Sequence, residues 1–97
     1  MKMHQVRYFL ALCEENNFSR AAQHCRVAQP SLTDGIKRLE SKLGGALFYR
    51  SHSETRLTKL GKLVHPCMKK INQEVVRAHQ IARKYVGRVT NETSLVE

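Results

Sequence analysis

Five polar residues are spaced so that they would share one side of a helix: Gln29, Thr33, Asp34, Lys37 and Arg38. A glutamine can make two hydrogen bonds to adenine, and a threonine can bond several base edges or place its methyl group against thymine. Lysine and arginine suit phosphates, which position a protein on a duplex without reading its sequence. The pattern therefore indicates a surface that reads nucleic acid, with an ordinary solvated helix face as the alternative.

The element that must carry these residues is a helix predicted over residues 29–43. Its apolar residues recur at i, i+4, i+7 and i+11, and they are Leu32, Ile36, Leu39 and Leu43. This spacing is typical of a helix with one buried stripe. Pro30 fits the first turn, where its missing N–H has no helical partner, and Gly44 fits a left-handed C-cap. The polar side is therefore expected to point outward from an apolar back.

Two shorter helices are expected before this one. Apolar spacing predicts a first helix over about His4–Glu15 and a second over residues 20–25, with Ser19 as its N-cap. Ala21 and Ala22 are small enough for two helices to cross closely. A four-residue turn then leads into the third helix. This order is the connection of a helix-turn-helix.

The pattern next changes to short β-prone runs over residues 47–50 and 55–58, separated by four turn-like residues. These runs predict a small antiparallel hairpin, or wing. A two-stranded hairpin is not stable alone, so Leu47, Phe48 and Leu57 are expected to pack against the helices.

Four residues near these elements suit the nucleic-acid backbone. Arg50 and Arg56 on the wing are expected to reach phosphate or the minor groove, with ordinary solvated arginine as the alternative. The N-terminal amides of the second helix, at Ser19 and Arg20, could hold a phosphate.

A long helix is expected after Thr58, which would cap it. It runs to about Val86, roughly 43 Å, and Pro66 inside it predicts a bend. Its apolar positions follow a near-heptad spacing, and they form a predicted dimer seam: Leu60, Val64, Cys67, Ile71, Val75, Ala78, Ile81 and Tyr85. A helix that projects from a small domain with an apolar seam is expected to pair with a second chain.

The formal net charge of the 97 residues is +9, and residues 59–88 carry eight basic side chains against Glu74 alone. This balance invites an anionic partner, with nucleic acid first and a membrane surface second. No run approaches the ~20 apolar residues of a membrane span. No signal pattern begins the chain either, so an intracellular protein is expected.

The three cysteines, Cys13, Cys25 and Cys67, are odd in number and widely spaced. We interpret them as small buried residues rather than metal ligands or disulfide partners. No nucleophile–base spacing, paired carboxylates or glycine-rich phosphate loop stands out, so the sequence predicts no enzyme.

Several motifs occur together and in order: Phe18–Ala22 (FSRAA), Val27–Thr33 (VAQPSLT), Ile36–Glu40 (IKRLE), Leu43–Gly44, Leu47–Arg50 (LFYR), Leu57–Thr58 and Gly61. From about residue 3 to residue 85 the chain resembles the N-terminal DNA-binding domain of LysR-type transcriptional regulators. The resemblance implies a mainly α fold: a winged helix-turn-helix of three helices and a two-stranded wing, followed by a long dimerising linker helix.

The expected division is a DNA-binding domain over residues 1–58, a linker helix over 59–88, and a disordered polar tail over 89–97. In the family a larger effector-binding domain normally follows, and none of these 97 residues is expected to belong to it. A small-molecule coinducer would bind there, so no cofactor is expected in this chain.

The resemblance also implies site residues. In the family, the residues that match Gln29, Pro30, Thr33 and Asp34 approach bases, and the wing lies along the minor groove. The residues expected at the DNA backbone are Ser19, Arg20, Ser31, Lys37, Arg38, Arg50 and Arg56.

Four sites depart from the family pattern. Ala28 replaces a serine that is a better N-cap, a loss of ~1 kcal/mol. Asp34 stands where a basic or amide residue is common, and it would accept a hydrogen bond from cytosine N4 instead of binding phosphate. Gly45 replaces a valine, and His52 and Ser53 stand at the wing tip where arginine or glycine is usual.

The sequence therefore predicts sequence-specific binding of double-stranded DNA by a cytoplasmic bacterial regulator. It would act as a dimer, with one recognition helix at each half-site of an inverted repeat, and the pairing of two dimers into a tetramer is left open. One alternative is a basic module that binds an acidic protein or membrane surface through the long helix. Another is an RNA binder, although the phenylalanines are expected to be buried rather than to form a stacking platform.

Overall fold

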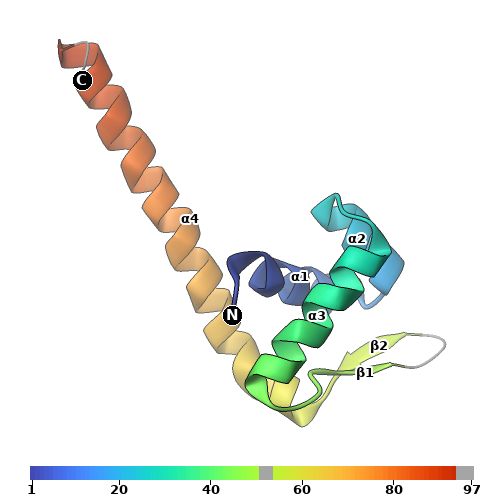
Figure 1. The fold of residues 1–97 in the computed structure, drawn as a ribbon. Helices are drawn as coiled ribbons and strands as arrows, with labels where there is room; N and C mark the ends of the chain where they lie inside the picture. The colour runs from blue at the N-terminus through green and yellow to red at the C-terminus, as the bar shows by residue number, and fades with distance from the viewer. Residues whose placement is uncertain (51–53, 94–97) are drawn as a thin grey trace.

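The computed structural model describes residues 1–50 and 54–93. In this part the chain forms four helices and a two-stranded sheet: α1 (Met3–Glu15), α2 (Phe18–Cys25), α3 (Gln29–Leu43), β1 (Phe48–Arg50), β2 (Thr55–Leu57) and α4 (Lys59–Thr93). The first three helices pack together, the wing extends from one side of them, and α4 leaves this body as a long rod (Figure 1). The predicted mainly α fold with a wing is confirmed.

One apolar core joins the helices to the wing. Its fully buried large side chains are Val6, Phe9, Leu12, Leu32, Ile36, Leu39 and Leu47. Ala21 and Ala22 are buried as expected, and their small side chains let α2 approach α1 and α3 closely. The apolar stripe of α3 is therefore packed inward, and its polar side is held outward.

Two asparagines make the turn between α1 and α2. Asn16 ends α1 in the left-handed conformation, with φ of 56°. The side chain of Asn17 then accepts a hydrogen bond from the Arg20 N–H at 2.8 Å and so caps α2. The expectation that Ser19 would be the cap is wrong, because Ser19 already lies within the first turn of α2.

The turn between α2 and α3 closes the end of α2 through its backbone. Arg26 is left-handed, with φ of 58°, and the Val27 N–H donates to the carbonyl of Ala22 at 3.0 Å. These are features of a Schellman motif. Gly44 ends α3 in the left-handed conformation as expected, with φ of 89°.

The wing is a short antiparallel hairpin fixed to the core at its base. Phe48 pairs with Leu57 across the two strands. Phe48 is buried and Leu57 packs against the core, as expected. The predicted departures at His52 and Ser53 lie outside the described residues.

Thr58 connects the wing to α4. Its hydroxyl donates to the carbonyl of Ala46 at 2.7 Å and accepts from the Gly61 N–H at 3.0 Å. The second bond satisfies an N–H in the first turn of α4, so Thr58 is a helix cap as expected. The direction of α4 is thereby tied to the wing.

α4 is longer than expected, because it continues past Val86 to Thr93. Gly87 does not end it. A glycine inside a helix costs only about 1 kcal/mol relative to alanine, and Gly87 does not adopt a positive φ. The expected disordered tail is therefore corrected for residues 89–93, which are helical, while residues 94–97 lie outside the described part.

The predicted seam on α4 divides into two parts. Leu60, Val64 and Ile71 are partly buried and pack against the core of their own chain. Met68, which the heptad pattern leaves out, is only 3% exposed and belongs to that core. The buried side of α4 is thus rotated from the predicted seam, because the body covers α4 from one side. The seam residues that stay exposed are Cys67, Ala78, Ile81 and Tyr85, and Val75 is half-buried.

Candidate nucleic-acid interface

The N-terminal part of α3 carries a shallow surface hollow. It is lined by Gln29, Pro30, Thr33, Asp34 and Lys37. Thr33 is half-buried and the others are exposed. The structure therefore brings together the four residues that the resemblance places near bases, with Lys37 beside them and Ser31 exposed in the same first turns of the helix.

A hydrogen bond joins the start of α2 to the start of α3 next to this hollow. The Ser19 hydroxyl donates to Oε1 of Gln29 at 2.8 Å. The bond orients the glutamine amide, whose NH₂ group and second oxygen lone pair remain able to bond. An oriented amide suits the two-bond contact that glutamine makes with adenine.

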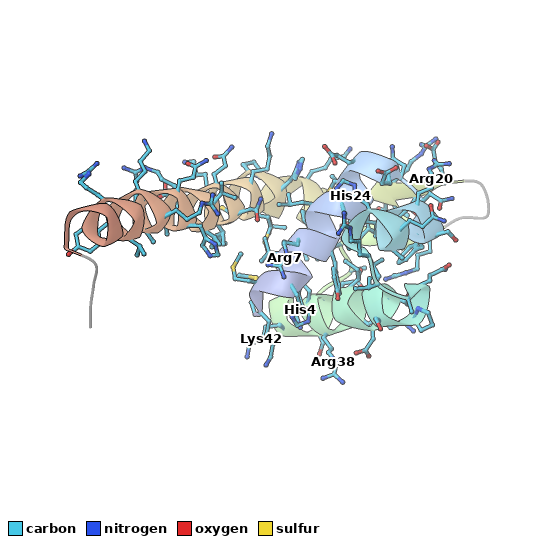
Figure 2. The ribbon with its side chains drawn as sticks, turned by 90° about the horizontal axis from the view of Figure 1, so that it is seen from above. His4, Arg7, Arg20, His24, Arg38 and Lys42 are labelled. Atoms are coloured by element: carbon cyan, nitrogen blue, oxygen red, sulfur yellow. The ribbon has the colours of Figure 1, made fainter. Side chains whose placement is uncertain are left out.

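Asp34 and Arg38 form an ion pair on the exposed side of α3. Nε of Arg38 donates to Oδ2 of Asp34 at 2.7 Å. Figure 2 shows Arg38 and Lys42 projecting from α3 on the side away from α4. Lys37, by contrast, makes no ion pair with any of the residues that the structure describes.

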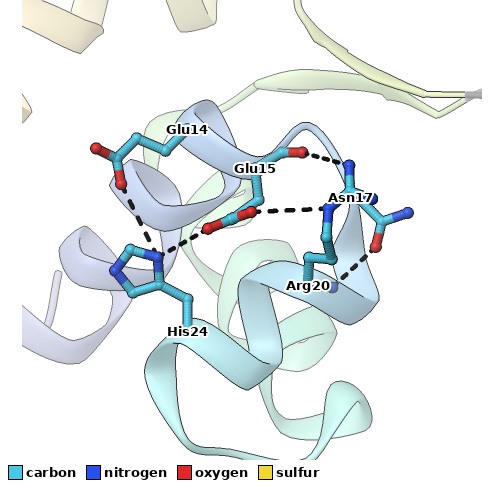
Figure 3. Close-up of polar contacts among 5 residues, drawn as sticks. All are labelled: Glu14, Glu15, Asn17, Arg20 and His24. Atoms are coloured by element: carbon cyan, nitrogen blue, oxygen red, sulfur yellow. Dashed lines mark hydrogen bonds and ion pairs between the residues drawn. The ribbon is translucent and has the colours of Figure 1, made fainter.

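Arg20 is held at the end of α1. Its Nη2 donates to the backbone carbonyl of Glu15 at 3.2 Å, and its Nε lies 3.7 Å from Oε1 of the same residue (Figure 3). The other Glu15 oxygen lies 3.1 Å from Nδ1 of His24, which is also 3.9 Å from Oε1 of Glu14. This cluster ties α2 to α1. The contacts with Glu15 use Nη2 and Nε of Arg20, so Nη1 of this exposed side chain could still donate to a phosphate.

Glu40, absent from the predicted site residues, joins α3 to the wing. Its Oε2 accepts from the Leu47 N–H at 2.8 Å, and its Oε1 accepts from Nη2 of Arg50 at 3.1 Å. The Arg50 guanidinium also lies 5.5 Å from the centre of the Phe18 ring. Arg50, which pairs with Thr55 at the outer end of β1, therefore ties the wing to α3 and to the start of α2. The available sequence signal was a second acidic residue, after Asp34, in a helix whose later polar residues include Lys37, Arg38 and Lys42.

Arg56, on the other strand of the wing, lies 3.8 Å from Glu54, and its side chain is 77% exposed. Long exposed ion pairs of this kind contribute little to stability. Its guanidinium can therefore leave Glu54 for a phosphate at low cost.

Replacing Glu40 with alanine is expected to lower the free energy of unfolding by about 2 kcal/mol, because it leaves the buried Leu47 N–H without an acceptor. The Glu40 side chain is only 12% exposed, so water replaces it poorly. Glu40→Gln keeps an acceptor oxygen but removes the charge facing Arg50, and about half of that loss is expected. Urea denaturation followed by circular dichroism measures both.

Glu74→Ala is the matched control, because it also removes a carboxylate from an ion pair. That pair is exposed on α4, where Oε1 of Glu74 lies 3.3 Å from Nη1 of Arg77. A change below about 0.5 kcal/mol is expected there. Equal losses for Glu40→Ala and Glu74→Ala would contradict the role of Glu40 as the link between α3 and the wing.

A cleft of about 710 Å³ lies between α1, the end of α2 and α4, and it contains none of the predicted DNA-facing residues. Cys13 and Cys25 line it. Burial raises the pKa of Cys13 to about 12, and burial also raises the pKa of Cys25 against the opposing effect of Arg7. Both stay protonated thiols at neutral pH. The prediction of burial holds in part for these two and is wrong for Cys67, which is exposed on α4.

Within the described residues, no three histidine, cysteine, aspartate or glutamate side chains gather in a way that could hold a metal ion. None of the helices in the same part of the chain has both the length and the apolar character needed to cross a membrane.

Two helices joined by a tight turn, a wing and a polar recognition surface define a winged helix-turn-helix domain of the DNA-binding class. The family model described as "Bacterial regulatory helix-turn-helix protein, lysR family" matches residues 3–62. The chain therefore belongs to the LysR family, which is a family of transcriptional regulators and not of enzymes.

Two relatives show how much of the chain is shared. The HTH-type transcriptional regulator XapR of Escherichia coli K12 is 39% identical over 88 residues, which cover 87% of this chain and 30% of XapR. The HTH-type transcriptional regulator BudR of Klebsiella aerogenes is 34% identical over 94 residues, which cover 93% of this chain and 66% of BudR. The chain thus corresponds to only part of each relative.

Two similar solved structures contain DNA. A complex of the CbnR DNA-binding domain with DNA has a TM-score of 0.81 and 31% identity, covering 89% of this chain and 99% of that one. The BenM DNA-binding domain with catB site 1 DNA has a TM-score of 0.83 and 29% identity, covering 89% of this chain and 97% of that one. These findings support DNA binding and transcription regulation over the alternative of a basic interaction module.

Proposed function

We propose that this chain binds double-stranded DNA sequence-specifically, with the N-terminal part of α3 in the major groove. The observation that carries the proposal is the exposed hollow over Gln29, Pro30, Thr33 and Asp34. It is held outward by the buried stripe on the opposite side of α3. A recognition helix meets base edges with its N-terminal residues, and this is where the hollow lies.

We assign the phosphate contacts to polar residues around the hollow and on the wing. They are Ser19, Arg20, Ser31, Lys37, Arg50 and Arg56. Lys37 can contact a phosphate without breaking an existing ion pair, because it forms none with the described residues. Phosphate contacts release bound counterions, so the affinity is expected to fall steeply as salt is added.

We also propose that two chains pair through the far half of α4. Ile81 and Tyr85 are 56% and 65% exposed there, beyond the reach of the chain's own core. Together with Ala78 they continue the predicted seam, and a row of exposed apolar side chains on a projecting helix favours association. Pairing would set two α3 helices at the two half-sites of an inverted repeat.

The wider proposal is a cytoplasmic bacterial regulator that acts on transcription. XapR and BudR are named as transcriptional regulators and are longer than this chain. The resemblance to LysR-type regulators implies an effector-binding domain on the C-terminal side of such a DNA-binding domain, and any small-molecule coinducer would bind there.

Replacing Gln29 with alanine tests the base-reading role. The affinity for a selected target duplex is expected to fall about tenfold, because a two-bond contact to adenine is lost. Binding to random duplex should stay nearly unchanged, since phosphate contacts supply most of it. The measurement is a titration of both duplexes at one stated salt concentration.

Lys37→Ala is the control on the same helix, and it should weaken binding to both duplexes alike. If Gln29→Ala instead weakened both duplexes equally, the proposed base contact would be excluded.

A further inference from the structure

We propose that Asp34 and Arg38 act together to read a guanine, with Arg38 making the base contact and Asp34 positioning its guanidinium. The inference rests on the proposed function and deepens it, because it gives Arg38 a base-reading role instead of the phosphate contact predicted from the sequence. It also names a G·C base pair as part of the target.

The first step is the contact itself. Nε of Arg38 lies 2.7 Å from Oδ2 of Asp34, which is the length of a strong charge-assisted hydrogen bond. The two side chains are 70% and 61% exposed. An exposed i,i+4 pair contributes little to fold stability, so its main consequence is where the guanidinium is held.

The second step is direction. Side chains on a helix lean toward its N-terminus, and a residue covers the turn before its own position. The ion pair therefore draws the Arg38 head group back over the turn of Asp34, which lines the same hollow as Gln29 and Thr33. Arg38 directly follows Lys37, the last residue along α3 that lines the hollow. The ion pair with Asp34 brings its head group back to the part of α3 that would meet base edges.

The third step is chemistry. Because Asp34 uses Nε, both Nη groups of Arg38 remain free to donate. Two donors held in a plane match O6 and N7 of guanine, the commonest specific contact in the major groove. Asp34 alone would accept from cytosine N4, and Arg38 alone would suit phosphate. The Asp34–Arg38 pair is therefore expected to prefer guanine, which neither residue would select by itself.

The experiment selects bound duplexes from a random pool with the 97-residue wild type and with Asp34→Ala, Arg38→Ala and the double variant. The wild type is expected to select a G·C pair at one position of each half-site. Both single variants should lower that preference about tenfold. The double variant should lose no more than Arg38→Ala, because residues that act as one unit are not additive. Asp34→Asn keeps an acceptor for Nε and should retain part of the preference.

Glu74→Ala is the matched control, since it breaks an exposed ion pair with Arg77 on α4, away from the hollow. Its base preferences should equal those of the wild type. Circular dichroism should give the same helix content for every variant, because both members of the Asp34–Arg38 pair are exposed.

Three outcomes would overturn the inference alone. In the first, Asp34→Ala relaxes a cytosine preference that Arg38→Ala leaves intact. In the second, Arg38→Ala weakens selected and random duplexes equally, as a phosphate contact would. In the third, Gln29→Ala changes base choice while neither Asp34→Ala nor Arg38→Ala does. A wild type that selects no sequence at all would instead overturn the proposed function, and this inference with it.

Discussion

Replacing Gly61 with alanine is expected to lower the free energy of unfolding by about 3 kcal/mol, the upper end of what an added methyl group costs in a packed site. A Cβ atom at Gly61 would collide with the carbonyl oxygen of Leu47 and would lie 2.7 Å from Cδ2 of Leu57. The Leu47 carbonyl cannot move aside freely, because it accepts the Thr58 N–H at 2.9 Å. The first turn of α4 would therefore separate from the wing.

Urea denaturation of the wild type and the Gly61→Ala variant measures this effect. Gly87→Ala is the matched control, because a Cβ at Gly87 meets nothing within 4 Å. Alanine there should leave stability unchanged or raise it by up to about 1 kcal/mol, the difference in helix propensity. If Gly61→Ala had the same urea midpoint as the wild type, the junction between the wing and α4 would be more adaptable than the close packing at Gly61 indicates.

The helix-turn-helix could be predicted because its signals are local. The bounds of α3 match the predicted 29–43, since Pro30 and Gly44 mark its two ends and one stripe of leucine and isoleucine marks its inner side. The cap of α2 could not be placed in the same way. Asn17 and Ser19 are both good caps, and only the path of the backbone decides between them.

Side-chain pairing could be predicted only within one helix. Asp34 and Arg38 stand four residues apart, so an ion pair was open to inference from spacing. The contact of Glu40 with the Leu47 N–H depends on how the chain turns after Gly44, which periodicity does not determine. Arg20 likewise bonds Glu15 because the Asn16–Asn17 turn brings α1 and α2 together.

The long helix shows the limit of heptad patterns. Spacing identifies an apolar row, but it does not say whether that row meets the chain's own core or a second chain. Leu60, Val64 and Ile71 pack against the chain's own core, and Met68, which lies off the predicted seam, is buried in it. A charge at Ile71 would therefore disturb the fold as well as any dimer, and a test of pairing has to use residues farther along α4.

Ile81→Glu meets this requirement, because Ile81 is 56% exposed and lies outside the apolar core. The variant is expected to dissociate the proposed dimer without loss of helix content, since a carboxylate buried against a second apolar helix would lack a partner. Sedimentation should give the mass of one chain where the wild type gives two.

Ile81→Glu should also weaken DNA binding strongly, because two paired chains bind a duplex with two half-sites far more tightly than one chain does. When two DNA-binding domains are linked in a dimer, the second domain binds its half-site intramolecularly. The affinity of the dimer then exceeds that of a single domain by about 100-fold or more. Ile81→Glu should lose that factor on a duplex with both half-sites and keep the wild-type affinity on a duplex with one. Gln80→Glu adds the same charge at an exposed position off the seam, so it should dissociate nothing. An unchanged sedimentation mass for Ile81→Glu, or an equal loss of affinity on the two duplexes, would exclude the far half of α4 as the pairing surface.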